Sequence, residues 1–190
     1  MRYTVWALAG VGVLVLLLVQ CGAAGGSPAG PAGGRGFNAT DVMFLQMMVP
    51  HQGQGVRLVR MARERQVRPE VVTLAAAIET TQLDEIQAMA ARLRAWKRPR
   101  IASAHEHAAH GGMPETTDAE LEALARAPGG RFEREFLNLL IAHQDDAVQM
   151  ARMETGGGQD AWTRRLANNV DRSRSAQITR MLALLAPISR

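Results

Sequence analysis

Two stretches of the chain are closely similar: FLQMMVPHQGQGVRLVRM at residues 44–61 and FLNLLIAHQDDAVQMARM at residues 136–153. Aligning His51 with His143 sets an offset of 92 residues between them. The same offset aligns apolar residues further along the chain: Ile78 with Val170, Ile86 with Ile178, Met89 with Met181 and Leu93 with Leu185. A fixed offset carried through two successive segments indicates an internal duplication. Since each copy places a His-Gln pair inside an apolar segment, these pairs are candidate functional sites.

Both copies have the apolar spacing of amphipathic helices. The first helix is predicted to begin near Asn38, Thr40 or Asp41, with a kink just before His51 caused by Pro50. The remaining predicted helices are Pro69 to Trp96, a short helix from Thr117 with a capping box to Glu120, roughly 131–154 ended by Gly156-Gly157-Gly158, and a last helix from near Asp160. No segment alternates with period two. We therefore predict an all-α fold, a four-helix bundle of two tandem helix hairpins, with the short helix in a long crossover at 97–128.

The N-terminus has the features of an export signal. Residues 5–19 are apolar, follow Arg2 and are too few to span a bilayer. Cys21, the only cysteine, follows this run within Leu18-Val19-Gln20-Cys21, which resembles a lipoprotein cleavage box and predicts lipidation of Cys21. Cleavage after Ala24 and an uncleaved short anchor are the alternatives. Each places the body outside the cytoplasm, and lipidation would hold it at the outer face of the membrane.

The predicted organisation is a signal at 1–21, a flexible Gly/Ala/Pro tether at 22–36 and one helical domain at 37–190, with halves of about 37–97 and 129–190. The net charge is +4, but arginines alternate with acids along the helices, which is typical of solvated faces. The export signal and the 4% aromatic content disfavour nucleic-acid binding.

Methionine and histidine side chains share one face of the first predicted helix. Met43, Met47 and His51 follow one another at intervals of four residues, and Met48 borders the same face. The second copy carries His143, with Met150 two turns further on the same stripe. Thioether sulfur with imidazole nitrogen suits copper, Cu(I) above all. The alternative is that these methionines are core residues and the histidines hydrogen-bonded core residues.

The crossover holds a second candidate metal site. Its sequence is His-x-His-x-x-His followed by methionine, at His105, His107, His110 and Met113. Short histidine-rich tracts bind Cu(II), Zn(II) or Ni(II). The alternative is a polar loop that is merely rich in histidine.

Signals for catalysis are weak. A di-iron bundle needs Glu-x-x-His pairs, and no glutamate precedes a histidine by three residues in this sequence. The chain also lacks a Gly-x-Ser-x-Gly motif and a phosphate-binding loop. We therefore expect no catalytic residues and no enzyme, and a redox enzyme using bound copper is the weakest alternative.

The motifs resemble those of the DUF305 family. DVMFLQMMVPHQGQGVRLVRMA at residues 41–62 is similar to the first motif of the family, and FEREFLNLLIAHQDDAVQMARM at 132–153 to its second. The resemblance implies a ferritin-like four-helix bundle that is exported and binds copper through methionine and histidine. The matching residues are Met47, Met48 and His51 in the first copy and His143, Ala147 and Met150 in the second.

The chain also departs from the family pattern. Gln52 and Gln144 stand where the family has the second histidine of each pair, and other departures are Gly55, Leu58, Leu139 and Leu140. Glutamine is a poor ligand for Cu(I), so these changes weaken the expected core site. The sequence therefore predicts an extracytoplasmic protein that buffers copper, gives the cell resistance to it or delivers it, with the metal bound as Cu(I) or Cu(II). The alternative is a metal-free interaction module at the cell surface, and a homodimer is left open.

Overall fold

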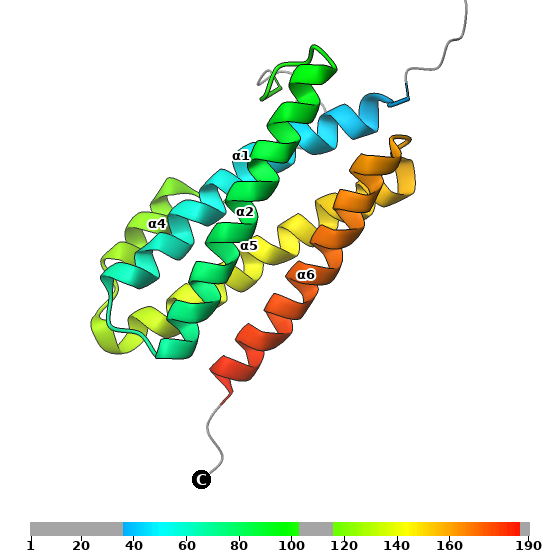
Figure 1. Ribbon diagram of the computed structural model, residues 1–190. Helices are drawn as coiled ribbons and strands as arrows, with labels where there is room; N and C mark the ends of the chain where they lie inside the picture. The colour runs from blue at the N-terminus through cyan, green and yellow to red at the C-terminus, as the bar shows by residue number, and fades with distance from the viewer. Residues whose placement is uncertain (1–35, 103–115, 187–190) are drawn as a thin grey trace, which may run out of the picture. The chain divides into compact units, whose positions relative to one another are not determined.

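The computed structural model describes residues 36–102 and 116–186 (Figure 1). Within this part, every regular element is helical. The elements are α1 (Ala39–Met61), the 3-10 helix η1 (Ala62–Glu64), α2 (Pro69–Ala95), α4 (Asp118–Ala125), α5 (Gly129–Gly157) and α6 (Ala161–Leu185). The all-α prediction is confirmed. In the described part of the chain, no helix is both long enough and apolar enough to cross a membrane.

The helix ends follow the capping residues in the sequence. Asn38 accepts a hydrogen bond from the Asp41 amide, while the Asp41 side chain accepts one from the Asn38 amide. Thr117 and Glu120 form the expected capping box of α4. The Asp160 side chain caps α6. These bonds satisfy amides that a helix N-terminus leaves unpaired. Both bounds of α5 differ from expectation, because it begins earlier than predicted, at Gly129, and continues past Glu154 through two of the three glycines to Gly157.

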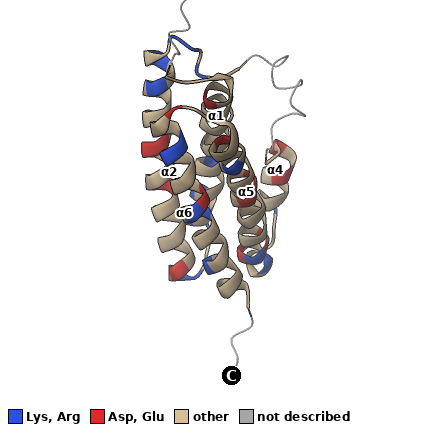
Figure 2. Ribbon diagram, turned by 90° about the vertical axis from the view of Figure 1, so that its right-hand side faces the viewer, with Lys and Arg blue, Asp and Glu red and all other residues tan. Residues whose placement is uncertain are grey.

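Helices that follow one another in the sequence pack as pairs. α1 packs along α2, α5 packs along α6, and α1 and α5 join the two pairs (Figure 1). α4 lies against α5. The helix α1 continues through Pro50, which lies inside it. Lys, Arg, Asp and Glu are interspersed along the helices (Figure 2), as expected of solvated faces.

The hydrophobic interior consists of two separate clusters. The first, here the α1–α2 turn cluster, contains Leu58, Val71, Phe132 and Met181 among others. The second, the α5–α6 turn cluster, contains Phe44, Leu93, Ala151 and Ala167 among others. Each cluster draws on all four long helices, so each contributes the burial that holds the two helix pairs together. Polar residues occupy the interior between the two clusters.

Candidate metal centre

A layer of polar residues crosses the interior between the two hydrophobic clusters. We call it the polar layer. Its members are buried or half-buried, and every long helix contributes: His51, Gln52 and Gly55 from α1, Gln82 and Glu85 from α2, His143 and Gln144 from α5, and Arg174 and Gln177 from α6. Because a buried polar group without a partner is costly, the bonds inside this layer decide what it can do.

The amides of the polar layer form matching bonds in the two halves of the chain. The Gln52 side-chain amide donates to the Glu85 carboxylate at 2.6 Å. At the positions 92 residues later, the Gln144 amide donates to Gln177. Gln82 connects the two halves by donating to the Gln144 oxygen at 3.5 Å. Both glutamines that replace the family's histidines are therefore held by the layer, each by a neighbour on the adjacent helix of its own pair.

The two duplicated histidines meet face to face. His51 is fully buried and His143 is 1% exposed. Their rings stack with centroids 4.0 Å apart and planes 3° from parallel. His51 Nε2 lies 3.1 Å from the His143 carbonyl oxygen. The two imidazoles therefore lie against each other where α1 and α5 join the two halves.

His143 is held as a neutral imidazole. Burial, then the neighbouring His51 and Arg174, lower its pKa from 6.5 to about 2. Its Nδ1 lies 3.0 Å from the Thr116 hydroxyl oxygen. If Nδ1 carries the proton and donates it to Thr116, Nε2 presents a lone pair, which is the form that binds metal. Among the described residues, His143 Nε2 has no hydrogen-bond partner.

Gly55 lets this nitrogen and the Gln82 side-chain amide pack closely against the backbone of α1, an arrangement that we call the cradle. A Cβ atom at Gly55 would lie 2.6 Å from His143 Nε2 and 2.6 Å from Gln82 Oε1. The Gln82 amide nitrogen would lie 2.9 Å away, so a methyl group at Gly55 would require these side chains to shift. Gln82 Oε1 also has no hydrogen-bond partner in the described part of the chain. Two unpaired, buried donor atoms for a metal therefore face one point.

The predicted methionines lie beside the polar layer. Met47, Met48 and Met150 are buried in the α5–α6 turn cluster, and half-buried Met43 packs against it. They bring soft sulfur to the cluster next to the histidines. Within residues 36–102 and 116–186, no three His, Cys, Asp or Glu side chains are grouped to hold a metal ion. A metal site in this interior would therefore have to recruit thioether or amide groups.

Several predicted positions lie outside the described residues. They are the crossover residues His105, His107, His110 and Met113, and the lipidation candidate Cys21. Conversely, sequence reasoning missed two residues of the cradle, Gly55 and Gln82. Gly55 stands out in the sequence only as a departure from the family pattern, and Gln82 was not predicted as a site residue, because neither residue type by itself indicates a site.

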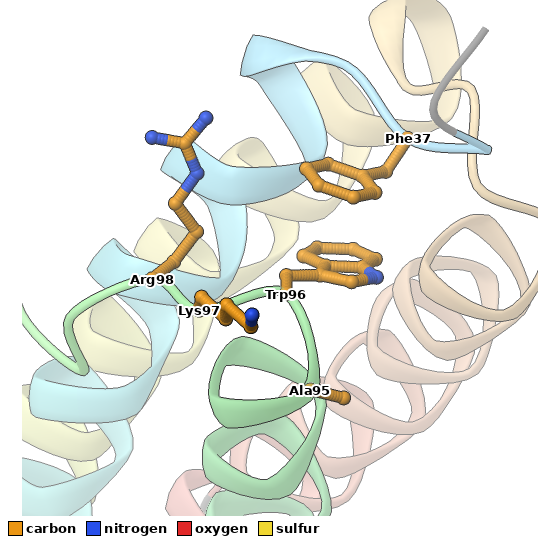
Figure 3. A pocket seen from close by; sticks show the side chains of 5 residues that line it. All are labelled: Phe37, Ala95, Trp96, Lys97 and Arg98. Carbon is orange, nitrogen blue, oxygen red and sulfur yellow. The ribbon is translucent and has the colours of Figure 1, made fainter. Parts of the chain in front are cut away.

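A surface hollow of about 490 Å³ lies at the end of α2 (Figure 3). Phe37 stacks on Trp96 at its edge, with ring centroids 4.1 Å apart. Ala95, Lys97 and Arg98 complete the lining. Cationic and aromatic side chains are not copper ligands, so this hollow is no candidate for the metal site.

The described residues form a small all-helical fold with histidine and methionine in its interior, and the comparisons identify its family. The family described as "Domain of unknown function (DUF305)" matches residues 41–185. The chain belongs to the DUF305 family. No curated protein matches the sequence.

Solved structures of the same family resemble this one. A Streptomyces coelicolor DUF305 protein, named as secreted, superposes with a TM-score of 0.72 at 30% identity, covering 77% of this chain and 91% of its own. A DUF305 fragment from Deinococcus radiodurans has a TM-score of 0.69 at 29% identity, covering 80% and 98%. CopM in its Cu(I)-bound form has a TM-score of 0.65 at 31% identity, covering 77% and 96%. CopM has also been solved with Cu(II) and with silver.

Proposed function

We propose that this protein binds copper outside the cytoplasm through histidine and methionine ligands, and buffers it or passes it to a partner. The observation that carries the proposal is the unpaired Nε2 of His143, held neutral inside a fold that CopM shares in its Cu(I)- and Cu(II)-bound forms. Neutral imidazole is the ligand form, so the interior is ready to bind metal without first losing a proton.

The environment of the histidines supports copper over harder cations. His51 and His143 stack beside the α5–α6 turn cluster, which contains Met47, Met48 and Met150. Thioether and imidazole ligands together select copper, whereas Mg²⁺ and Ca²⁺ need oxygen ligands. We propose these residues, with Met43, as the interior copper ligands.

The crossover and the N-terminus complete the proposal. His105, His107, His110 and Met113 form a second copper site in the crossover. The chain is exported and anchored at the outer face of the membrane through a lipid on Cys21. The role is binding, so no residue acts as a catalyst. The secreted family member from Streptomyces coelicolor supports the extracytoplasmic location.

The test is an anaerobic Cu(I) titration of the detergent-solubilised full chain against a chromophoric competitor. Three proteins are compared: the unmodified chain, His51→Ala/His143→Ala, and His105→Ala/His107→Ala/His110→Ala. Each variant is expected to lose part of the bound copper. A chain that never competes for Cu(I) or Cu(II), and whose melting temperature ignores both, would overturn the proposal and favour a metal-free interaction module.

A further inference from the structure

The surface hollow at the end of α2 is lined by side chains that copper binding does not use. Lys97 and Arg98 supply its positive charge, and the stacked rings of Phe37 and Trp96 form an aromatic wall. Figure 3 shows the Arg98 guanidinium and the ring pair on opposite sides of the hollow. Cations beside a half-buried tryptophan suit an anionic headgroup at the boundary between lipid and water.

Positive charge at this end of the bundle is not balanced by acids. Residues 86–102 include no acidic residue but five cations: Arg92, Arg94, Lys97, Arg98 and Arg100. Within the described residues, only Arg92 of these forms an ion pair, and its partner is Asp160. Asp41 and Glu154, the other acids at this end, are fully buried. The charged residues on the last turns of α2 are all basic in Figure 2, so this end presents a cationic surface.

The opposite end of the bundle carries a second hollow with a different charge pattern. This hollow, of about 340 Å³, lies where α2 and α5 begin and α6 ends. Two arginines line it, but Arg68 is paired with Glu133, which lines the same hollow. Acids therefore offset cations there. The excess of unpaired cations belongs to the end of α2 and is not a general property of an arginine-rich surface.

The turn that ends α2 fixes the two cations of the first hollow. The Lys97 amide donates to the Arg94 carbonyl, and the Arg98 amide donates to the Leu93 carbonyl. This is a Schellman turn, with Lys97 at φ 55° in the left-handed position that glycine usually fills. A glycine at position 97 would close the same turn with less strain. The lysine side chain can therefore be removed without removing the turn.

We propose that this end of the bundle docks on an anionic phospholipid surface, with a headgroup phosphate bound by Lys97 and Arg98 and with Trp96 at headgroup level. The proposal rests on the extracytoplasmic, lipid-anchored location proposed above. Phe37 lines the hollow, so an anchor at Cys21 joins the bundle at this end. Ile101, which is 54% exposed just after Arg100, adds an apolar side chain to the same surface.

The experiment uses the full chain reconstituted into phosphatidylcholine vesicles, with or without phosphatidylglycerol. A Trp6→Phe background leaves Trp96 and Trp162 as the only tryptophans. Lipids that carry a spin label on the headgroup quench tryptophan fluorescence at the membrane surface. We expect stronger quenching when phosphatidylglycerol is present, and a loss of this difference as the salt concentration rises.

Two double variants test whether the hollow itself binds the lipid. Lys97→Gly/Arg98→Gln should reduce the quenching to the level seen in phosphatidylcholine alone. Its melting temperature should not fall, because glycine relieves the left-handed position. The matched control is Arg134→Gln/Arg180→Gln, which removes two exposed cations near the opposite end. The control should leave the quenching unchanged.

The outcomes separate this inference from the proposed function. Equal quenching in both kinds of vesicle would overturn the docking and leave the hollow to an acidic partner protein. Equal losses in the two double variants would overturn it as well, because net charge would then explain the binding. Copper affinity should be unchanged in Lys97→Gly/Arg98→Gln, since neither residue is a proposed ligand. A chain that docks on phosphatidylglycerol but binds no copper would overturn the proposed function alone.

Discussion

Arg174 and Glu85 form an ion pair in the polar layer in which only one partner is fully removed from water. The Arg174 side chain is completely buried, whereas that of Glu85 is 14% exposed. Glu85 also accepts from Gln52, so the carboxylate keeps a partner if the arginine is lost. The two residues therefore depend on each other unequally.

This inequality gives the first prediction. Glu85→Gln leaves the Arg174 guanidinium buried without a counter-charge and should lower the free energy of unfolding by roughly 3–5 kcal/mol. Arg174→Gln should lower the free energy of unfolding by less, because Glu85 keeps its hydrogen bond from Gln52 and some contact with water. Urea denaturation of both variants measures the difference. Equal losses, or a larger loss for Arg174→Gln, would contradict the assignment of the buried charge.

The second prediction concerns Glu154, which is fully buried at the end of α5. Burial, then hydrogen bonding with Asp41 and the charges of Asp41 and Asp160, raise its pKa from 4.5 to about 8, although Arg164 lowers it. The folded state thus holds a proton that the unfolded state releases between these two values. The contribution of Glu154 to stability is complete below pH 4.5 and is lost as the pH rises towards 8.

Glu154→Gln removes this titration while keeping a neutral side chain of the same size. Its advantage over the unmodified protein should grow with pH by up to about 1.4 kcal/mol per unit. His143, whose lowered pKa gives a slope of opposite sign below pH 6.5, is present in both proteins, so its effect cancels in the comparison. Urea denaturation from about pH 5 to about pH 9 measures both proteins. Parallel pH profiles would show that Glu154 is ionised in the folded state.

The third prediction compares two glycines. A Cβ at Gly53 meets no atom within 4 Å, so Gly53→Ala should stabilise α1 by about 0.5–1 kcal/mol through its better helix propensity. A Cβ at Gly158 would lie 2.0 Å from Glu154 Oε1. Gly158→Ala should therefore destabilise the protein by displacing the buried carboxyl group. Thermal unfolding monitored by circular dichroism should show shifts of opposite sign, and stabilisation by Gly158→Ala would mean that Glu154 is free to move.

The fourth prediction concerns Thr116, the buried residue just before α4. Its hydroxyl lies 3.0 Å from His143 Nδ1. When the hydroxyl oxygen accepts the Nδ1 proton, Nε2 is left unprotonated, as metal binding requires. Thr116→Val should shift the tautomer equilibrium of His143 and weaken copper binding about 10–100-fold. Nitrogen NMR of the imidazole reports the tautomer without any metal. An unchanged tautomer would show that another contact orients the ring.

Much of this structure was predictable from the sequence because local rules govern it. Pro69, Thr117 and Asp160 mark helix starts by chemistry that acts within one turn, and the 92-residue offset marked His51 and His143 as equivalent positions. The cradle was not predictable in this way. Gly55 and Gln82 acquire their role only when α1, α2 and α5 pack together, and neither amide nor glycine has a distinctive spacing.

The buried pair of acidic residues, Glu154 and Asp41, could not be predicted from the sequence for a similar reason. Glu154 stands at the end of a helix, next to Thr155 and three glycines, where a carboxylate is usually solvated. Only the packing of the α1 start against the α5–α6 turn buries it beside Asp41, whose carboxylate accepts from the Gln159 and Asp160 amides. Contacts between residues more than 100 positions apart leave no local mark in the sequence.

The polar layer also fixes how the two helix pairs align lengthwise. Its bonds between the pairs join His51 to the His143 carbonyl, Gln82 to Gln144 and Arg174 to Glu85. Sliding one pair past the other by a single helical turn, about 5.4 Å, would break all three and press charged and amide groups against the hydrophobic clusters. Apolar contacts alone would tolerate such a slip far better. The hydrogen bonds of the layer therefore allow only one lengthwise register between the two helix pairs, whether or not metal is bound.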